Sequence, residues 1–84
     1  MSRLKFRHDV QVRIRPDALL QVRSVEQAAQ VLLEQWPAEY AWTPEKIAAA
    51  GACLRASKTR KLVDVELARE AFVKAARQAG LLHE

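Results

Sequence analysis

The sequence predicts a single α+β domain in which a two-stranded antiparallel hairpin is followed by three helices. Apolar and polar residues alternate with period two from Leu4 to Ile14, which is typical of a half-buried strand, and three later stretches carry apolar residues at helical spacing. The chain has 84 residues, which is enough for one core. We therefore expect one domain over residues 10–84, with residues 1–9 as a tail or as an extension of the first strand.

The composition is typical of a folded protein from a reducing compartment. Hydrophobic residues make up 50% of the chain and charged residues 29%, as in ordinary globular domains. Cys53 is the only cysteine, so no disulfide can form within the chain and stability must come from packing. No apolar run is long enough for the core of a signal peptide or for a membrane span. We expect a cytoplasmic protein with no membrane partner.

The charges fall in blocks of opposite sign. Residues 1–23 carry six basic and two acidic side chains, and residues 24–45 carry four acidic and no basic ones. Residues 46–61 carry five basic and no acidic side chains, whereas residues 62–84 carry three basic and four acidic ones. The net charge of +4 is therefore unevenly spread, which argues against a uniformly basic nucleic-acid binder. The blocks predict a dipolar surface that is either self-complementary or suited to an asymmetric partner.

The N-terminal alternation predicts the first strand of the hairpin. Apolar side chains occupy even positions and basic side chains occupy odd ones, but His8 and Asp9 interrupt the pattern. The stretch is therefore either one strand of up to about 13 residues or a tail followed by a core strand over residues 10–14. The Pro16-Asp17 dipeptide is typical of a turn, and the second strand is expected over residues 19–23.

The register of the hairpin follows from which side chains must share a face. Pairing Ile14 with Leu20 and Val12 with Val22 keeps apolar side chains opposite one another. A two-residue loop would instead place Val12 opposite Gln21, so we expect a loop of three or five residues.

The first helix is expected over residues 25–36. Ser24, followed three residues later by Gln27, is a capping box, and Pro37 ends the helix because the residue before a proline is pushed out of the α region. The residues expected on its apolar face recur at helical spacing: Val25, Ala28, Ala29, Leu32, Leu33 and Trp36. Trp36 closes this face and is expected in the core.

The second helix is expected to begin after Thr43, a suitable N-cap, with Pro44 at the first helical position, where the missing N–H costs nothing. The expected buried stripe is made of Ile47, Ala50, Gly51 and Leu54, with Cys53 alongside. The small residues in this stripe would let another helix approach closely. The polar and basic stretch Ser57-Lys58-Thr59-Arg60-Lys61 is expected to form a loop.

The third helix is expected to be capped by Asp64 and to end at Gly80, with Leu81 folding back onto the last turn in a Schellman motif. The expected buried face carries apolar residues at helical spacing: Leu67, Ala68, Ala71, Phe72, Ala75, Ala76 and Ala79. Phe72 is the only large aromatic residue of this helix, so we expect it at the centre of the core.

Three spaced motifs stand out in the helical part of the chain. They are Ser24-Val25-Glu26-x-Ala28 with Leu32 or Leu33 before Trp36-Pro37, Ala49-x-x-x-Cys53-x-x-Ala56, and Ala68-Arg69-x-Ala71-Phe72-x-x-Ala75-Ala76-x-x-Ala79-Gly80. Over roughly residues 10–82 the chain resembles the domain of unknown function 982 family, short bacterial proteins that are frequent in rhizobia and their relatives. The resemblance implies a fold and no activity, so it supplies no catalytic residues.

The chain departs from the family pattern in its connectors. Residues 57–61 stand where the family commonly has a glycine shortly after the cysteine-bearing helix, and extra residues precede Asp64. Trp42 stands near the place where a turn containing glycine is expected. We therefore expect the helices to follow the family and the loop geometry to differ.

No catalytic, metal or cofactor motif is complete in the sequence. Cys53 lies in the middle of a helix among small residues, where it is expected to be an inert packing residue and not a nucleophile with a lowered pKa. His8 and His83 lie near opposite ends of the chain and have only the adjacent Asp9 and Glu84 as carboxylate neighbours, which is no zinc motif. We expect no catalytic residue, no cofactor and no metal.

Two groups of side chains are candidates for contact with a partner. Tyr40 and Trp42 lie in the connector between the first two helices and are suited to cover the edge of the core or to contact a protein. The basic candidates belong to the outer face of the hairpin and to the second connector: Arg13, Arg15, Arg23, Arg55, Lys58, Arg60 and Lys61. They could bind a polyanion, or they could only keep these surfaces soluble and blunt the sheet edges.

These observations predict a small non-catalytic protein of unknown function that acts as a protein-interaction or accessory module. A homodimer is expected, because the apolar alternation from Leu4 to Ile14 is longer than the second strand can pair with and its surplus could add to the sheet of a neighbouring chain. The alternative is a nucleic-acid-binding module that uses the basic hairpin face and the connector at residues 55–61.

Overall fold

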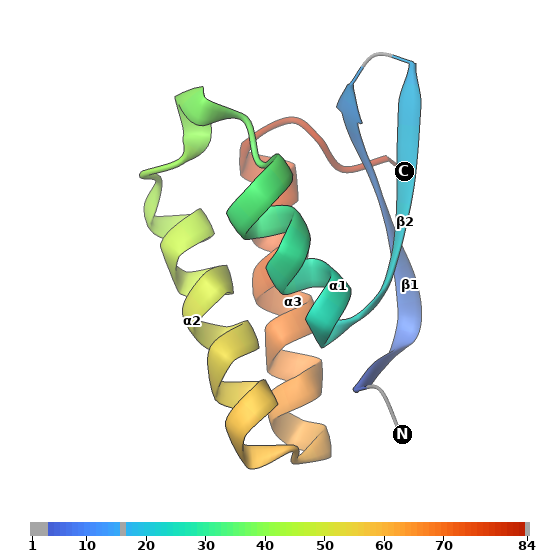
Figure 1. Cartoon of the computed structure of the whole chain (residues 1–84), viewed down its shortest axis with the longest axis vertical. Coiled ribbons are helices and arrows are strands. Elements are labelled where there is room, and N and C mark those ends of the chain that lie inside the picture. Colours follow the sequence, from blue (N-terminus) through green and yellow to red (C-terminus); the bar gives the residue numbers. More distant parts are fainter. Residues whose placement is uncertain (1–3, 16, 84) are drawn as a thin grey trace.

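The computed structural model describes residues 4–15 and 17–83, without the side chain of Arg15. Pro16, part of the predicted turn, lies outside the described residues. The chain forms seven elements in the described part: β1 (Lys5–Arg15), β2 (Ala18–Ser24), α1 (Val25–Gln30), the π-helical turn η1 (Val31–Gln35), the 3₁₀ turn η2 (Ala38–Tyr40), α2 (Pro44–Thr59) and α3 (Leu62–Gln78) (Figure 1). The predicted α+β fold class, a two-stranded antiparallel hairpin followed by three helices, is confirmed.

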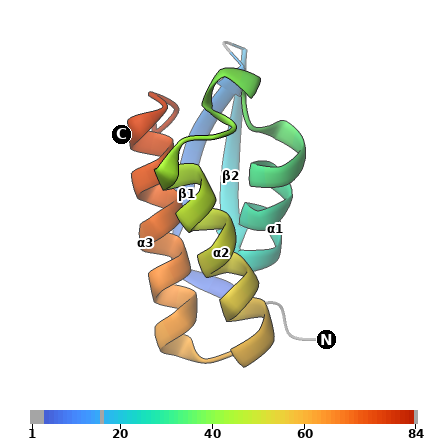
Figure 2. The same ribbon diagram turned by 90° about the vertical axis from the view of Figure 1, so that its left-hand side faces the viewer.

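The elements form three layers. The hairpin is the first layer, α1 and α3 lie side by side against one of its faces, and α2 lies on the far side of these two helices (Figures 1 and 2). Two helices therefore cover the sheet, and α2 packs on the helices and not on the strands. This arrangement leaves α2 with one face toward the molecule and one face toward solvent.

The register of the hairpin differs from the prediction. Val12 lies opposite Leu20 and Val10 opposite Val22, so β1 is displaced by two residues from the predicted pairing of Ile14 with Leu20. The parity was predicted correctly, because a slip by two residues keeps every side chain on its own face. Val10, Val12 and Val22 are accordingly buried.

The predicted loop of odd length is wrong because the strand ends contain a β-bulge. The last paired residues are Arg15 and Ala18, with residues 16–17 between the strands, and the register shifts between Arg13 and Arg15. The bulge takes up one residue of β1, so a two-residue connection and the apolar pairing of the strands are both satisfied.

The interruption predicted at His8 and Asp9 is a second irregularity of β1. Lys5 lies opposite Ser24, and regular pairing resumes only at Val10. Phe6 on one side of the irregularity is buried in the core. Residues 5–9 thus belong to the strand, and its bulged part keeps the apolar side chains on the helix-facing side.

The C-terminal end of α3 forms the predicted Schellman motif. Gly80 has φ 72°, the Leu81 N–H donates to the carbonyl of Ala76 at 2.8 Å, and the Gly80 N–H donates to the carbonyl of Arg77 at 3.1 Å. Leu81 folds back and is buried, as predicted.

The chain then returns to the sheet, which the sequence did not indicate. The Arg13 N–H donates to the carbonyl of Leu81 at 2.7 Å, and the His83 N–H donates to the carbonyl of Gln11 at 2.9 Å. Leu82 pairs with Val12 as an antiparallel bridge. The middle of β1 is therefore hydrogen-bonded on both edges, to β2 on one side and to the C-terminal segment on the other.

The core lies where the three layers meet. Phe72 is fully buried at its centre, as predicted, and the ring of Trp36 packs against it with 5.9 Å between the ring centroids. The other large and fully buried side chains come from the hairpin, α1, η1 and α2: Val12, Val22, Val25, Val31, Leu32 and Cys53.

The first helix does not keep regular α geometry to residue 36. It changes at Val31 into a π-helical turn, whose i→i+5 hydrogen bonds add a residue and rotate the following side chains. Val31 and Leu32 are consequently buried, whereas Leu33 is 73% exposed. The prediction that Leu33 faces the core is therefore wrong.

The predicted loop at residues 57–61 is also wrong. α2 continues to Thr59 and ends at Arg60, which adopts the left-handed conformation with φ 57°. α3 begins at Leu62 with Lys61 at the N-cap position, so Asp64 is not the cap. Two consecutive helices therefore meet with only a two-residue joint between them.

Asp64 is instead a buried acceptor in the first turn of α3. It accepts a hydrogen bond from the Thr59 hydroxyl at 2.5 Å, and one of its carboxylate oxygens lies 3.7 Å from Arg55 Nε. The carboxylate also lies near the positive end of the α3 dipole, which favours its charge. Asp64 thus joins the end of α2 to the start of α3.

Candidate interaction surface

α2 carries two apolar faces. The inward face is made of the small residues Ala49, Cys53 and Ala56, all fully buried against α1 and α3. The stripe that the sequence analysis assigned to the core lies on the opposite side, where Ile47 is 53% and Leu54 is 59% exposed. The predicted periodicity is real, but the face assignment is wrong.

The outward residues follow the 3-4 spacing of a helix that packs on another helix. We call this row the outer stripe, and it runs along α2 from one end to the other: Pro44, Ile47, Gly51, Leu54 and Lys58. A row with this spacing faces a single direction over the whole length of a helix. The outer stripe therefore offers one continuous surface to whatever lies beside it.

Exposed leucines from the neighbouring elements widen this surface. On one side, a groove of about 300 Å³ runs between η1 and α2 beneath Leu33 and Leu54. Its lining is almost entirely apolar: Ala29, Leu33, Ala50, Gly51, Leu54 and Ser57. On the other side, Leu67 of α3 is 52% exposed and borders two further grooves between α2 and α3. Leu67 was predicted to be buried, and that prediction is wrong.

Gly51 lies at the centre of the outer stripe without a reason inside the molecule. It is exposed, its φ is not in the left-handed region, and a Cβ at this position would have no atom within 4 Å beyond its chain neighbours and the backbone of its own helix. A glycine in the interior of an exposed helix costs about 1 kcal/mol relative to alanine. Neither a turn nor internal packing accounts for a glycine at this position.

The two connector aromatics predicted as contact candidates differ in exposure. Tyr40 ends η2 and is half-buried against the core. Trp42 precedes α2 and is 86% exposed. Trp42 therefore adds a large exposed aromatic side chain at the N-terminal end of α2, and Tyr40 mainly covers the core edge.

The described basic candidates of the hairpin lie on the face that points away from the helices. Arg13 and Arg23 are exposed there, and the side chain of Arg15 lies outside the described part. Arg23 Nε lies 3.6 Å from Asp9 Oδ2, and Arg23 Nη2 donates to Gln21 Oε1 at 3.1 Å. Part of the positive charge of this face is thus balanced on the hairpin itself.

The remaining basic candidates gather at the joint between α2 and α3. Lys58, Arg60 and Lys61 are exposed, and Arg55 is paired with Asp64. Two exposed apolar side chains follow directly, Leu62 at 81% and Val63 at 62% exposure, and share a groove with Lys5, Arg7 and Glu66. The N-terminal part of β1 therefore lies close to the joint between α2 and α3.

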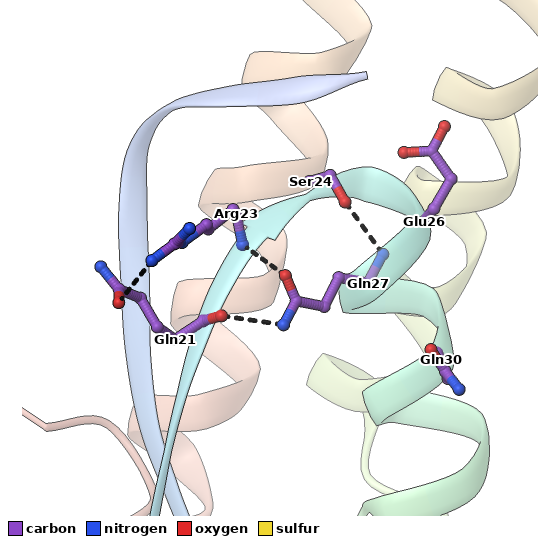
Figure 3. A pocket seen from close by; sticks show the side chains of 6 residues that line it. All are labelled: Gln21, Arg23, Ser24, Glu26, Gln27 and Gln30. Carbon is purple, nitrogen blue, oxygen red and sulfur yellow. Dashed lines mark hydrogen bonds between the residues drawn. The ribbon is translucent and has the colours of Figure 1, made fainter. Parts of the chain in front are cut away.

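The outer edge of β2 is capped by a side chain of α1. Gln27 Nε2 donates to the carbonyl of Gln21 at 2.8 Å, and Gln27 Oε1 accepts from the Arg23 N–H at 2.9 Å (Figure 3). Ser24 Oγ accepts from the Gln27 N–H at 3.2 Å, as the predicted capping box requires. The Gln27 side chain, however, binds the N–H of Arg23 and not that of Ser24.

The groups considered for chemistry lie apart. Cys53 is fully buried, and burial raises the pKa of its thiol from 9.0 to about 11. His8 is exposed on β1, and His83 is exposed in the C-terminal segment. Within residues 4–15 and 17–83, no three His, Cys, Asp or Glu side chains are grouped so that they could hold a metal ion.

The helices of the described part are also too short or too polar to cross a bilayer.

Comparison of the chain with known protein families gives a match. The family described as protein of unknown function (DUF982) matches residues 9–83. The chain belongs to the DUF982 family. No curated protein and no solved structure matches it significantly. The motifs from which the resemblance was inferred supply the inward sides of the DUF982 helices, including Ala49, Cys53, Ala56 and Phe72.

The outward surface of this DUF982 protein was missed in the sequence analysis. A signal for it was present, because two apolar rows offset around α2 cannot both face one core. The row of Ile47 and Leu54 was assigned to the core because it is apolar and contains small residues, but Ala49 and Cys53 form the row that packs inward, where small side chains let the helices approach closely.

Proposed function

We propose that this DUF982 protein is a non-catalytic interaction module of the cytoplasm that binds a protein through the outer stripe of α2. The observation that carries the proposal is the helix-packing row of Ile47, Gly51 and Leu54, which is open to solvent and widened by Leu33 and Leu67. Contiguous exposed apolar surface of this kind is typical of protein–protein contact sites. A non-catalytic role is supported by the burial of the Cys53 thiol.

Site-specific photo-crosslinking in the native host tests this proposal. A photoreactive phenylalanine analogue at Ile47 is expected to give a covalent adduct with one defined protein, which is either a second copy or another chain. The matched control places the same analogue at Gln11, which is exposed on the hairpin. The proposal is wrong if position 47 gives no more adduct than position 11.

A second candidate function is nucleic-acid binding at the joint between α2 and α3. The observation that favours it is the gathering of Lys58, Arg60 and Lys61 with Lys5 and Arg7 around one end of the molecule. Such a cluster can bind phosphates by releasing counterions, which makes the affinity fall linearly with the logarithm of the salt concentration. The outer stripe is favoured over this cluster because exposed cations are also common on surfaces that bind nothing.

A further inference from the structure

The strongest unexplained feature is the combination of an exposed apolar row with a glycine at its middle. α2 runs from Pro44 to Thr59, so Gly51 lies close to the midpoint of the helix. The open space around its Cβ position means that nothing within this molecule uses the missing side chain. A glycine at this position would, however, allow a second helix to pack closely, because two helix backbones can approach each other where a side chain is missing.

The charges around α2 indicate which helix packs on the outer stripe. Acidic residues outnumber basic ones around the N-terminal end of α2, where Glu34 of η1, Glu39 of η2, Glu45 of α2 and Glu70 of α3 stand against Lys46 and Lys74 (Figure 1). The basic residues Lys58 and Lys61 lie at its other end, at the joint with α3. The surface beside α2 is therefore dipolar and is complementary to itself when it is reversed.

We propose that a second copy of this chain docks on the outer stripe with its α2 antiparallel, so that the two Gly51 residues meet on a two-fold axis. This inference rests on the proposed function and names its partner. Reversal about the axis places the acidic end of each surface over the basic end of the other, whereas parallel packing would bring like charges together. Ile47 and Leu54 lie on either side of Gly51 and close the contact above and below the axis.

The proposed dimer interface differs from the one expected from the sequence, which was placed at the N-terminal strand. The N-terminal part of β1 pairs within the chain, since Lys5 lies opposite Ser24 and the Val25 N–H donates to the carbonyl of Leu4, so the surplus length of β1 is taken up by its bulge. The outer edge of β2 is capped by Gln27. Because both sheet edges are partly occupied within the chain, the helical face is the larger open surface for a second copy.

Single cysteines along the outer stripe test the arrangement directly. In the antiparallel dimer the two copies of residue 51 lie on the axis, whereas the two copies of residue 58 are about 21 Å apart, at 1.5 Å of rise per residue. Under mild oxidation at pH 7.5, Gly51→Cys is expected to form a disulfide-linked dimer and Lys58→Cys is not. Native Cys53 stays silent because it is fully buried. Disulfides at both positions would indicate parallel packing and overturn the antiparallel arrangement.

Sedimentation equilibrium of the unmodified chain and of Gly51→Leu gives the second test. We expect the unmodified chain to be dimeric at about 100 μM. A concentration this high is needed because one helix face is at the small end of stable interfaces. Gly51→Leu is expected to weaken the dimer at least tenfold while it keeps the fold, since leucine has the higher helix propensity and the position is exposed, with open space around an added Cβ. The matched control Gln30→Leu, on an exposed position of α1, is expected to leave the dimer unchanged.

The outcomes separate this inference from the proposed function. A monomer at 100 μM, with no disulfide from Gly51→Cys, overturns the second copy as the partner. If the photo-crosslink at Ile47 then joins another protein, the proposed function stands and only the identity of the partner is wrong. If position 47 gives no adduct above the control, both fail.

Discussion

Phe72 is the side chain on which all three layers depend, because it is fully buried and packs against Trp36. Truncation of a central aromatic residue leaves a cavity that a small core cannot close. Phe72→Ala is therefore expected to lower the free energy of unfolding by about 3 to 5 kcal/mol, measured by chemical denaturation.

The matched control for Phe72 is Leu67→Ala on the same helix. Both residues were predicted to face the core, but Leu67 is 52% exposed. The control is expected to cost less than about 1 kcal/mol, as is usual for surface substitutions. Equal losses for the two variants would contradict the observed orientation of α3.

Cys53 makes the stability of the protein depend on pH in the alkaline range. Burial raises the pKa of its thiol from 9.0 to about 11, so the folded state holds the proton more tightly than the unfolded state. Below pH 9 the thiol is protonated in both states and the stability does not depend on it. Between pH 9 and 11 only the unfolded state loses the proton, so the free energy of unfolding falls by about 2 to 3 kcal/mol. Over this interval, the free energy of unfolding of the unmodified chain is expected to fall relative to that of Cys53→Ala, measured by chemical denaturation of both.

The same burial predicts the reactivity of the thiol. At neutral pH, an alkylating reagent is expected to leave Cys53 unmodified until the chain is denatured, because the thiolate is scarce and inaccessible. Mass spectrometry of the folded protein after exposure to the reagent checks this. Rapid alkylation of the folded chain would speak for a reactive cysteine and against a packing role.

At the scale of elements, one side-chain amide links α1 to the outer edge of β2. Gln27 satisfies a carbonyl of Gln21 and the N–H of Arg23 on an exposed strand edge (Figure 3). Gln27→Ala is expected to cost about 0.5 to 1.5 kcal/mol, since water replaces the lost partners, and to speed hydrogen exchange of the Arg23 amide. Gln30→Ala on the exposed side of the same helix should change neither. An unchanged Arg23 exchange rate in Gln27→Ala would contradict the cap.

The sequence predicted the elements better than their faces. Alternation in β1 and the Gly80 end of α3 depend on local chemistry, and both were predicted correctly. The inward face of α2 depends on how closely three helices approach, which a periodic row of larger residues such as Ile47 does not reveal. The cap at Asp64 failed for a related reason, because Thr59 and Arg55 of the preceding helix bind this carboxylate.

The surface candidates were predictable as residue types but not as a site. Lys58, Arg60 and Lys61 are adjacent in sequence, so their grouping needed no fold. Lys5 and Arg7 approach this group because the N-terminal end of β1 lies beside the start of α3, which is a tertiary contact. The exposure of Leu33 depends on a π-helical turn, which has no reliable sequence signal.

At the scale of the whole molecule, the positive charge is divided between the hairpin and the joint of α2 with α3 and does not form one track. We therefore expect binding to duplex or single-stranded nucleic acid to be weaker than about 10 μM at physiological salt, the range of non-specific contacts. Reversal of Arg60 and Lys61 to Glu should abolish what binding remains at low salt, while Arg13→Glu on the hairpin should change it less. Fluorescence anisotropy over a salt series measures both, and a nanomolar, sequence-specific complex would reverse the order of the two candidate functions.

The return of residues 81–83 to the middle of β1 bears on how the protein matures on the ribosome. β1 is synthesised before the helices, yet the hydrogen bonds of Arg13 to Leu81 and of His83 to Gln11 need residues that follow α3. Contacts between such distant parts of a chain form late and slow the folding of a domain. During synthesis one edge of β1 therefore stays open to other strands until residues 81–83 have left the ribosome.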